Sequence, residues 1–226
     1  MVFLWIGLVL FFGPHLFSAF RDRSPEKDIR TRLGYGPYMG LYSIVSLTGL
    51  VLIFIGYGAM RPAPVVYPVP AWGQTLNLIL MLPALILITV SQFPAGHMKR
   101  RLKHPMLVAI KMWAMGHLLA NGELNSVILF GAFLVYAVID RIAVKRRGDN
   151  GPLDAVPDIK WDILCVFVGF AAYAAFIMFL HQLLFGVPVY AQASASIDAS
   201  LAAWFSAISA STTLPSSSPV TILSSL

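Results

Sequence analysis

Charged residues are scarce in this chain. Asp, Glu, Lys and Arg together make up 12% of its 226 residues. Hydrophobic residues make up 58%, and the mean hydropathy is +0.77. A soluble domain of this length cannot bury so much apolar surface in one core. The composition therefore excludes a soluble globular protein and predicts a membrane protein.

Cysteine is almost absent as well, because Cys165 is the only one. A single cysteine excludes an internal disulfide, and we expect Cys165 to be a buried, inert thiol. The glycines of the second apolar stretch do not follow a predicted strand, so they do not form a phosphate-binding loop. We expect them instead to let two helices approach closely. They are Gly34, Gly36, Gly40, Gly49, Gly56 and Gly58.

Long apolar stretches take up most of the chain as far as residue 185. They are residues 2–20, 37–60, 74–93, 105–120, 124–144 and 161–185. Most of them reach the roughly 20 residues that a membrane-spanning helix needs. The sequence therefore predicts an all-α fold, a polytopic transmembrane helix bundle of about six spans.

Lys and Arg residues gather in every second connection between these stretches. The first, third and fifth connections hold most of them, whereas the second has only Arg61 and the fourth has none. The positive-inside rule places the basic connections in the cytoplasm. We therefore expect a multi-pass protein of the bacterial inner membrane with both termini outside. The same rule explains the pI near 9.6, so we expect no nucleic-acid partner.

The end of the chain differs in composition from the rest. It carries no charged residue after Asp198 and is rich in Ser, Ala and Thr. We expect residues 1–189 to form the transmembrane domain and residues 190–226 to form a largely disordered tail. Apolar residues from Ile197 to Ile208 recur at helical spacing, which predicts a short helix on the outer membrane surface within the tail.

Ionisable side chains inside the apolar stretches are the candidates for chemistry, because an unpartnered one in lipid is costly. They are His15, Lys111, His117, Asp140 and His181. The turn at Asn121-Gly122 predicts a hairpin of the fourth and fifth spans. This hairpin places His104 opposite Asp140, and Lys111 shares the helix face of His104. We expect His104, Lys111 and Asp140 to form a polar seam with a structural role.

His15 and His117 are the histidines that lie well inside apolar stretches. Two neutral imidazoles on different helices are a common way for a membrane bundle to hold haem iron. In the alternative interpretation, each histidine only hydrogen-bonds a backbone carbonyl or a serine of a neighbouring helix. His15 lies about 7 Å and His117 about 20 Å from the basic ends of their helices, so a shared haem requires tilted or displaced helices.

We expect His181 at the outer interface and His97 in a solvated loop.

Several motifs resemble those of the NnrU family of integral membrane proteins. The most specific part runs from HPMLV at residues 104–108 through KMWAMGHLLANG at residues 111–122 to Asp140-Arg141. The opening GPHLFS at residues 13–18 fits as well, and the resemblance covers about residues 1–185. It implies a role in the nitrogen-oxide metabolism of denitrifying bacteria, with a nitrite or nitric oxide reductase system as a partner.

The plant and cyanobacterial zeta-carotene isomerases look like distant relatives, and they are integral membrane haem proteins. Their haem is tied to the histidines of a first-helix His-Ser motif and of a Trp-Cys-Leu-Ala-His motif, which correspond to His15 and His117. This chain has Leu16 in place of the serine and Ala114 in place of the cysteine. The resemblance therefore implies b-type haem with His15 and His117 as axial ligands of its iron more directly than it implies isomerase chemistry.

Four functions remain open from the sequence. The first is an NnrU-type protein that uses haem b to sense or handle nitric oxide or redox state. The second is a haem-dependent isomerase of a polyene or isoprenoid lipid. The third is a membrane methyltransferase, because RLKHP at residues 101–105 resembles the Arg-His-Pro element of isoprenylcysteine methyltransferases. The fourth is a non-catalytic assembly or scaffold subunit of a respiratory reductase. Membrane lipids are expected to contact the protein in every case.

Overall fold

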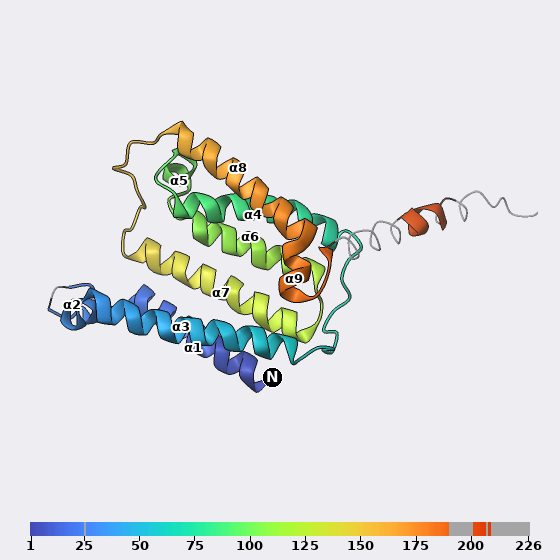
Figure 1. The fold of residues 1–226 in the computed structure, drawn as a ribbon, viewed down its shortest axis with the longest axis horizontal. Coiled ribbons are helices and arrows are strands. Elements are labelled where there is room, and N and C mark those ends of the chain that lie inside the picture. Colours follow the sequence, from blue (N-terminus) through green and yellow to red (C-terminus); the bar gives the residue numbers. More distant parts are fainter. Residues whose placement is uncertain (25, 190–200, 207, 209–226) are drawn as a thin grey trace, which may run out of the picture.

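The computed structural model describes residues 1–24, 26–189, 201–206 and 208 (Figure 1). Its elements are α1 (Val2–Phe20), α2 (Ile29–Leu33), α3 (Tyr35–Gly58), α4 (Gly73–Gln92), α5 (His97–Leu102), α6 (Pro105–Ala120), α7 (Leu124–Arg146), α8 (Ile159–Ala175), the π-helical turn η1 (Phe176–Leu180) and α9 (His181–Phe185). Within the described residues, β pairing is limited to a single bridge between Val65 and Glu123. The predicted all-α fold is confirmed.

Five helices are long and apolar enough to cross a membrane. They are α1, α3, α4, α7 and the helix Ile159–Phe185 formed by α8, η1 and α9. The sixth apolar helix, α6, is shorter and has 16 residues. The six predicted spans thus correspond to six helices of a multi-pass bundle. The helices α2 and α5 were not predicted, because helices of 5 and 6 residues are too short to display a helical period.

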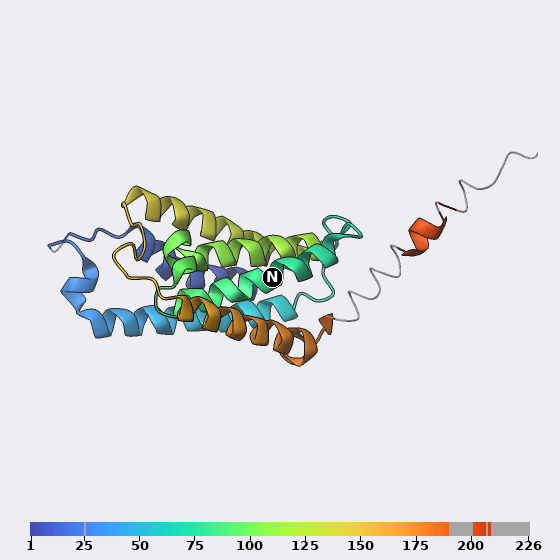
Figure 2. The same cartoon turned by 90° about the horizontal axis from the view of Figure 1, so that it is seen from above.

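The helix α7 connects the two halves of the bundle. It packs against α6 on one side and α1 on the other, while α1 pairs with α3 and α4 packs against α6 and α8 (Figure 1, Figure 2). One end of the bundle, called the basic end below, carries α2, α5 and the connection between α7 and α8. The N-terminus and α9 lie at the opposite end. The basic connections therefore lie at the opposite end of the bundle from the N-terminus and α9, as the charge pattern predicts.

Glycines bring α1 and α3 into backbone contact. A Cβ on Gly7 would lie 2.6 Å from the backbone nitrogen of Ile53, and a Cβ on Gly49 or Gly56 would overlap the backbone of α1. The predicted close approach is confirmed at Gly49 and Gly56. It is wrong at the other four glycines. Among the described residues no other helix lies within 4 Å of a Cβ placed on Gly36, Gly40 or Gly58, and a Cβ on Gly34 meets only Pro37 of α3, at 3.8 Å. Close packing without side chains is how helices associate in lipid, where burying apolar area gives little gain.

The connection from α3 to α4 folds back over the turn between α6 and α7. The nitrogen of Val66 donates to the carbonyl of Gly122 at 2.8 Å, and the nitrogen of Leu124 donates to the carbonyl of Pro64 at 2.9 Å. The hydroxyl of Tyr67 donates to the carbonyl of Asn121 at 3.1 Å. The predicted α6–α7 hairpin is confirmed, and its turn is held by the connection between α3 and α4.

A buried carboxylate holds α5 at the basic end. Asp162, in the first turn of α8, accepts hydrogen bonds from the nitrogens of His97 at 2.7 Å and Met98 at 3.1 Å. These are orphan donors of the first turn of α5, and the helix dipole favours a negative charge there. The prediction of a loop at His97 is wrong, because this residue begins α5, although its side chain is 60% exposed. The Cys165 thiol, one turn further along α8, is buried as expected.

The predicted tail lies largely outside the described residues. Leu201–Ser206 is helical, as is Ile208, and these positions fall in the segment for which a short helix is predicted. Residues 190–200, 207 and 209–226 are outside the description.

Candidate functional site

His15 lies in the last part of α1 among aromatic rings. Its Nδ1 is 2.6 Å from the carbonyl oxygen of Phe11, one turn earlier. A carbonyl only accepts, so Nδ1 carries the proton and Nε2 of the neutral ring carries the lone pair. The imidazole stacks on Phe11 with a centroid distance of 4.5 Å, and it contacts Tyr42 of α3 and Tyr136 of α7.

His117 repeats this arrangement on α6. Its Nδ1 is 2.9 Å from the carbonyl oxygen of Trp113, again one turn earlier, so Nε2 is the nitrogen with the lone pair. The ring stacks on Phe130 of α7 at 4.5 Å between centroids. Both histidines are therefore held by their own helix in the tautomer that leaves Nε2 for a ligand. Metal-binding histidines commonly donate their other ring N–H to a backbone carbonyl in this way.

A row of aromatic residues on α7 lies between the two histidines. Phe130 contacts His117, Tyr136 contacts His15, and Phe133 lies between them in the sequence. The centroid of the Phe133 ring lies 5.4 Å from that of Phe11 and 5.2 Å from that of Trp113. Phe133 therefore contacts an aromatic neighbour of each histidine. Six residues of helix place the levels of Phe130 and Tyr136 about 9 Å apart along α7. This row was not predicted, although Phe130, Phe133 and Tyr136 follow one another at a spacing of three residues in the sequence.

The residues fit a haem in their donor chemistry but not in their spacing. Two imidazoles with free Nε2 atoms and aromatic neighbours suit an axial-ligand pair. To bind one iron together, the two imidazoles would have to face each other. In this structure the ring of Phe133 lies between Phe11, a neighbour of His15, and Trp113, a neighbour of His117. The structure therefore keeps the depth difference between His15 and His117 that the sequence indicates. A shared haem would require Phe133 to turn away and α1 and α6 to shift.

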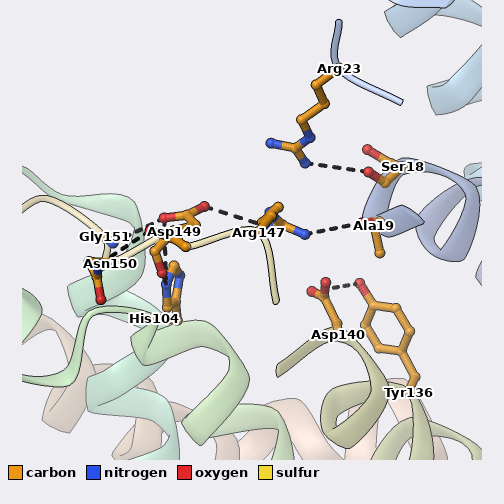
Figure 3. A network of polar contacts seen from close by, with 11 residues as sticks. Ser18, Ala19, Arg23, His104, Tyr136, Asp140, Arg147, Asp149, Asn150 and Gly151 are labelled. Atoms are coloured by element: carbon orange, nitrogen blue, oxygen red, sulfur yellow. Dashed lines mark hydrogen bonds and ion pairs between the residues drawn. The ribbon is translucent and has the colours of Figure 1, made fainter. Parts of the chain in front are cut away.

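The polar seam is arranged differently from the prediction. His104, at the start of α6, lies with its Nε2 3.0 Å from the carbonyl oxygen of Asp149 and 3.7 Å from that residue's carboxylate (Figure 3). Asp140 accepts a hydrogen bond from the hydroxyl of Tyr136 at 3.4 Å. Lys111 forms no hydrogen bond or ion pair with another described residue. The expected pairing of His104 with Asp140 is thus replaced by a pairing with Asp149, from the connection after α7.

Tyr136 links Asp140 to the surroundings of His15. Its ring lies 5.8 Å from the imidazole of His15, while its hydroxyl reaches Asp140. The hairpin count that placed Asp140 opposite His104 could not find this grouping, because it depends on α1 packing against α7.

His181 lies at the opposite end of the bundle, at the start of α9. Its Nδ1 is 2.6 Å from the carbonyl oxygen of Val187. Arg61 donates to the carbonyl of Phe185 at 3.2 Å, so α9 is tied to the end of α3. This position agrees with the interfacial location expected for His181.

Comparison with known families adds the decisive observation. The family model described as NnrU protein matches residues 3–189. The chain belongs to the NnrU family. This match includes both candidate haem ligands and all six apolar helices, and it ends where the described part of the bundle ends. No curated protein and no solved structure matches the chain.

Proposed function

We propose that this NnrU protein binds b-type haem through His15 and His117 in the inner membrane of a bacterium and serves nitrogen-oxide metabolism there. The observation that carries the proposal is that the two imidazoles are held in the same tautomer by the same kind of hydrogen bond. Each donates Nδ1–H to the carbonyl one turn earlier and keeps Nε2 available. A bound haem would supply an iron centre for nitric oxide binding or electron transfer.

The proposal requires a conformation in which α1 and α6 have shifted and Phe133 no longer separates the aromatic neighbours of the two histidines. Phe133 is partly exposed, so its ring has room to change rotamer. Phe133→Ala is therefore expected to raise haem occupancy, because it removes the ring that occupies the space between α1 and α6. Phe130→Ala is the matched comparison, since Phe130 is buried against His117 and its loss is expected to loosen that ligand instead.

The visible absorption spectrum of the purified full chain tests haem binding. Wild type expressed with ample haem is expected to show a Soret band and, when reduced, resolved α and β bands. His15→Ala and His117→Ala should each remove the six-coordinate spectrum, because each takes away one axial nitrogen. His97→Ala is the matched control and should leave the spectrum unchanged, since this side chain is exposed at the basic end.

Two results would contradict the haem proposal. A colourless wild type would leave the methyltransferase and scaffold alternatives, which nucleoside binding at the basic end and co-purification with a reductase would separate. A six-coordinate spectrum that persists in both His15→Ala and His117→Ala would assign the iron to other ligands.

Orientation in the membrane is a separate prediction. A reporter enzyme active only outside the cytoplasm, fused after Phe185, is expected to be active, because the basic connections should stay inside. The same reporter fused after Arg147 should be inactive. Activity only in the second fusion would reverse the proposed topology.

A further inference from the structure

A basic pocket lies between the ends of α1 and α7 at the basic end. Its volume is about 310 Å³, and its lining includes Arg21, Arg23, Arg146, Arg147, Phe20 and Ala143. Four of these six side chains are guanidinium groups. The other two, together with Ala19, give the pocket an apolar side next to the membrane-spanning segments.

Two of these arginines are held in place by the last turn of α1. Arg147 donates to the carbonyl of Ala19 at 3.1 Å, and Arg23 donates to the carbonyl of Ser18 at 3.4 Å (Figure 3). Cations are favoured at these carbonyls, because the C-terminal end of a helix carries partial negative charge. Arg23 and Arg147 thus approach α1 from two separate segments, which brings their charges near one another.

Arg21 has a buried donor without a partner. Its side chain is 8% exposed, and one Nη donates to the carboxylate of Asp28. The guanidinium also lies 5.8 Å from the ring of Tyr38. Its Nε, however, is buried and has no hydrogen-bond partner among the described residues. A buried polar atom without a partner is costly. Because Arg21 lines the pocket, an acceptor that entered the pocket would relieve this cost after a small shift of the side chain.

The charge around the pocket is not balanced by the protein. Arg21 pairs with Asp28 and Arg147 lies 3.7 Å from Asp149, whereas Arg23 and Arg146 form no ion pair with another described residue. The hydrogen bond from Arg21 holds the pKa of Asp28 below its usual range, so this carboxylate is committed to Arg21. Burial and the neighbouring charges of Arg147 and Arg21 lower the pKa of Arg23. The cluster therefore carries excess positive charge.

We propose that this pocket binds the phosphate group of an anionic phospholipid of the surrounding membrane. Arginine forks match phosphate oxygens in bidentate geometry. Basic pockets between membrane helices are suited to phospholipid headgroups. A soluble phosphate shares the oxyanion chemistry, but the apolar side formed by Phe20 and Ala143 lies where acyl chains would begin. This inference does not depend on haem binding.

Titration of the full chain with single lipids, followed by native mass spectrometry, tests the inference. Phosphatidylglycerol is expected to bind wild type more tightly than phosphatidylcholine. Arg23→Gln/Arg146→Gln should weaken phosphatidylglycerol binding at least about tenfold. The pair is chosen because neither arginine forms an ion pair in the described structure, so the fold should persist.

The control removes the same charge at the same end of the bundle. Arg100→Gln/Arg101→Gln lies in α5, outside the pocket, and should retain wild-type phosphatidylglycerol affinity within about twofold. Equal weakening in the two double variants would overturn the proposal, because it would show only general surface attraction. Inorganic phosphate that binds wild type as tightly as the lipid, and is lost in Arg23→Gln/Arg146→Gln, would assign the pocket to a soluble oxyanion and overturn the lipid.

Discussion

Gly49→Ala is expected to destabilise the bundle by about 1–3 kcal/mol. A methyl group at Gly49 overlaps the backbone of Phe11 and Leu10 on α1, and neither helix can yield without separating from the other. In lipid, much of the association energy of α1 and α3 comes from this close packing. Unfolding in mixed micelles by increasing SDS, followed by circular dichroism, measures the effect.

Gly40→Ala is the matched control on the same helix. No other helix of the described structure lies within 4 Å of a Cβ at Gly40, so the substitution should have no steric cost. It is expected to be neutral or stabilising by up to about 1 kcal/mol, because alanine favours helix over glycine. Equal destabilisation by Gly40→Ala and Gly49→Ala would contradict the described α1–α3 interface.

Asp162→Ala is expected to cost about 2–3 kcal/mol and to release α5 from α8. The substitution leaves the nitrogens of His97 and Met98 without their carboxylate acceptor. The first turn of α5 should then fray. Limited trypsin digestion in micelles reports this directly, because the basic residues of α5 become cleavable only when the helix opens. They are Lys99, Arg100 and Arg101.

Asp154→Ala provides the comparison for Asp162→Ala. Asp154 is exposed in the connection between α7 and α8, so its loss should change stability by less than about 0.5 kcal/mol. Cleavage in the segment around Arg146 and Arg147 serves as an internal reference and should not differ between the two variants. Unchanged protection of α5 in Asp162→Ala would show that the carboxylate does not hold this helix.

The helices themselves could be predicted because lipid imposes a strong local rule. Every backbone group in a spanning segment must be satisfied within the chain, so a long apolar run is a helix. The six apolar stretches therefore matched six helices, and the charge of their connections matched the two ends of the bundle. Short helices such as α5 escaped prediction, because they are stabilised by contacts such as that of Asp162 rather than by an apolar period.

The candidate site could be predicted only in part. A histidine inside an apolar run indicates a partner or a ligand, and this argument selected His15 and His117 from their residue type and their position in the sequence. It could not predict that Phe133 lies between their aromatic neighbours, since this depends on which face of α7 meets α1 and α6. The pairing of His104 with Asp149 was missed for the same reason, because it depends on the path of a loop.

The sequence by itself determined the six long apolar helices, their approximate extent and the separation of charge between the two ends of this NnrU protein. These properties follow from hydropathy and charge, which act locally along the chain. Only the tertiary structure decided which glycines bring α1 and α3 into contact, which backbone nitrogens the Asp162 carboxylate accepts from, and which arginines line the pocket beside Arg21. These are contacts between residues far apart in the chain, and helix packing in lipid sets them through backbone shape and a few hydrogen bonds.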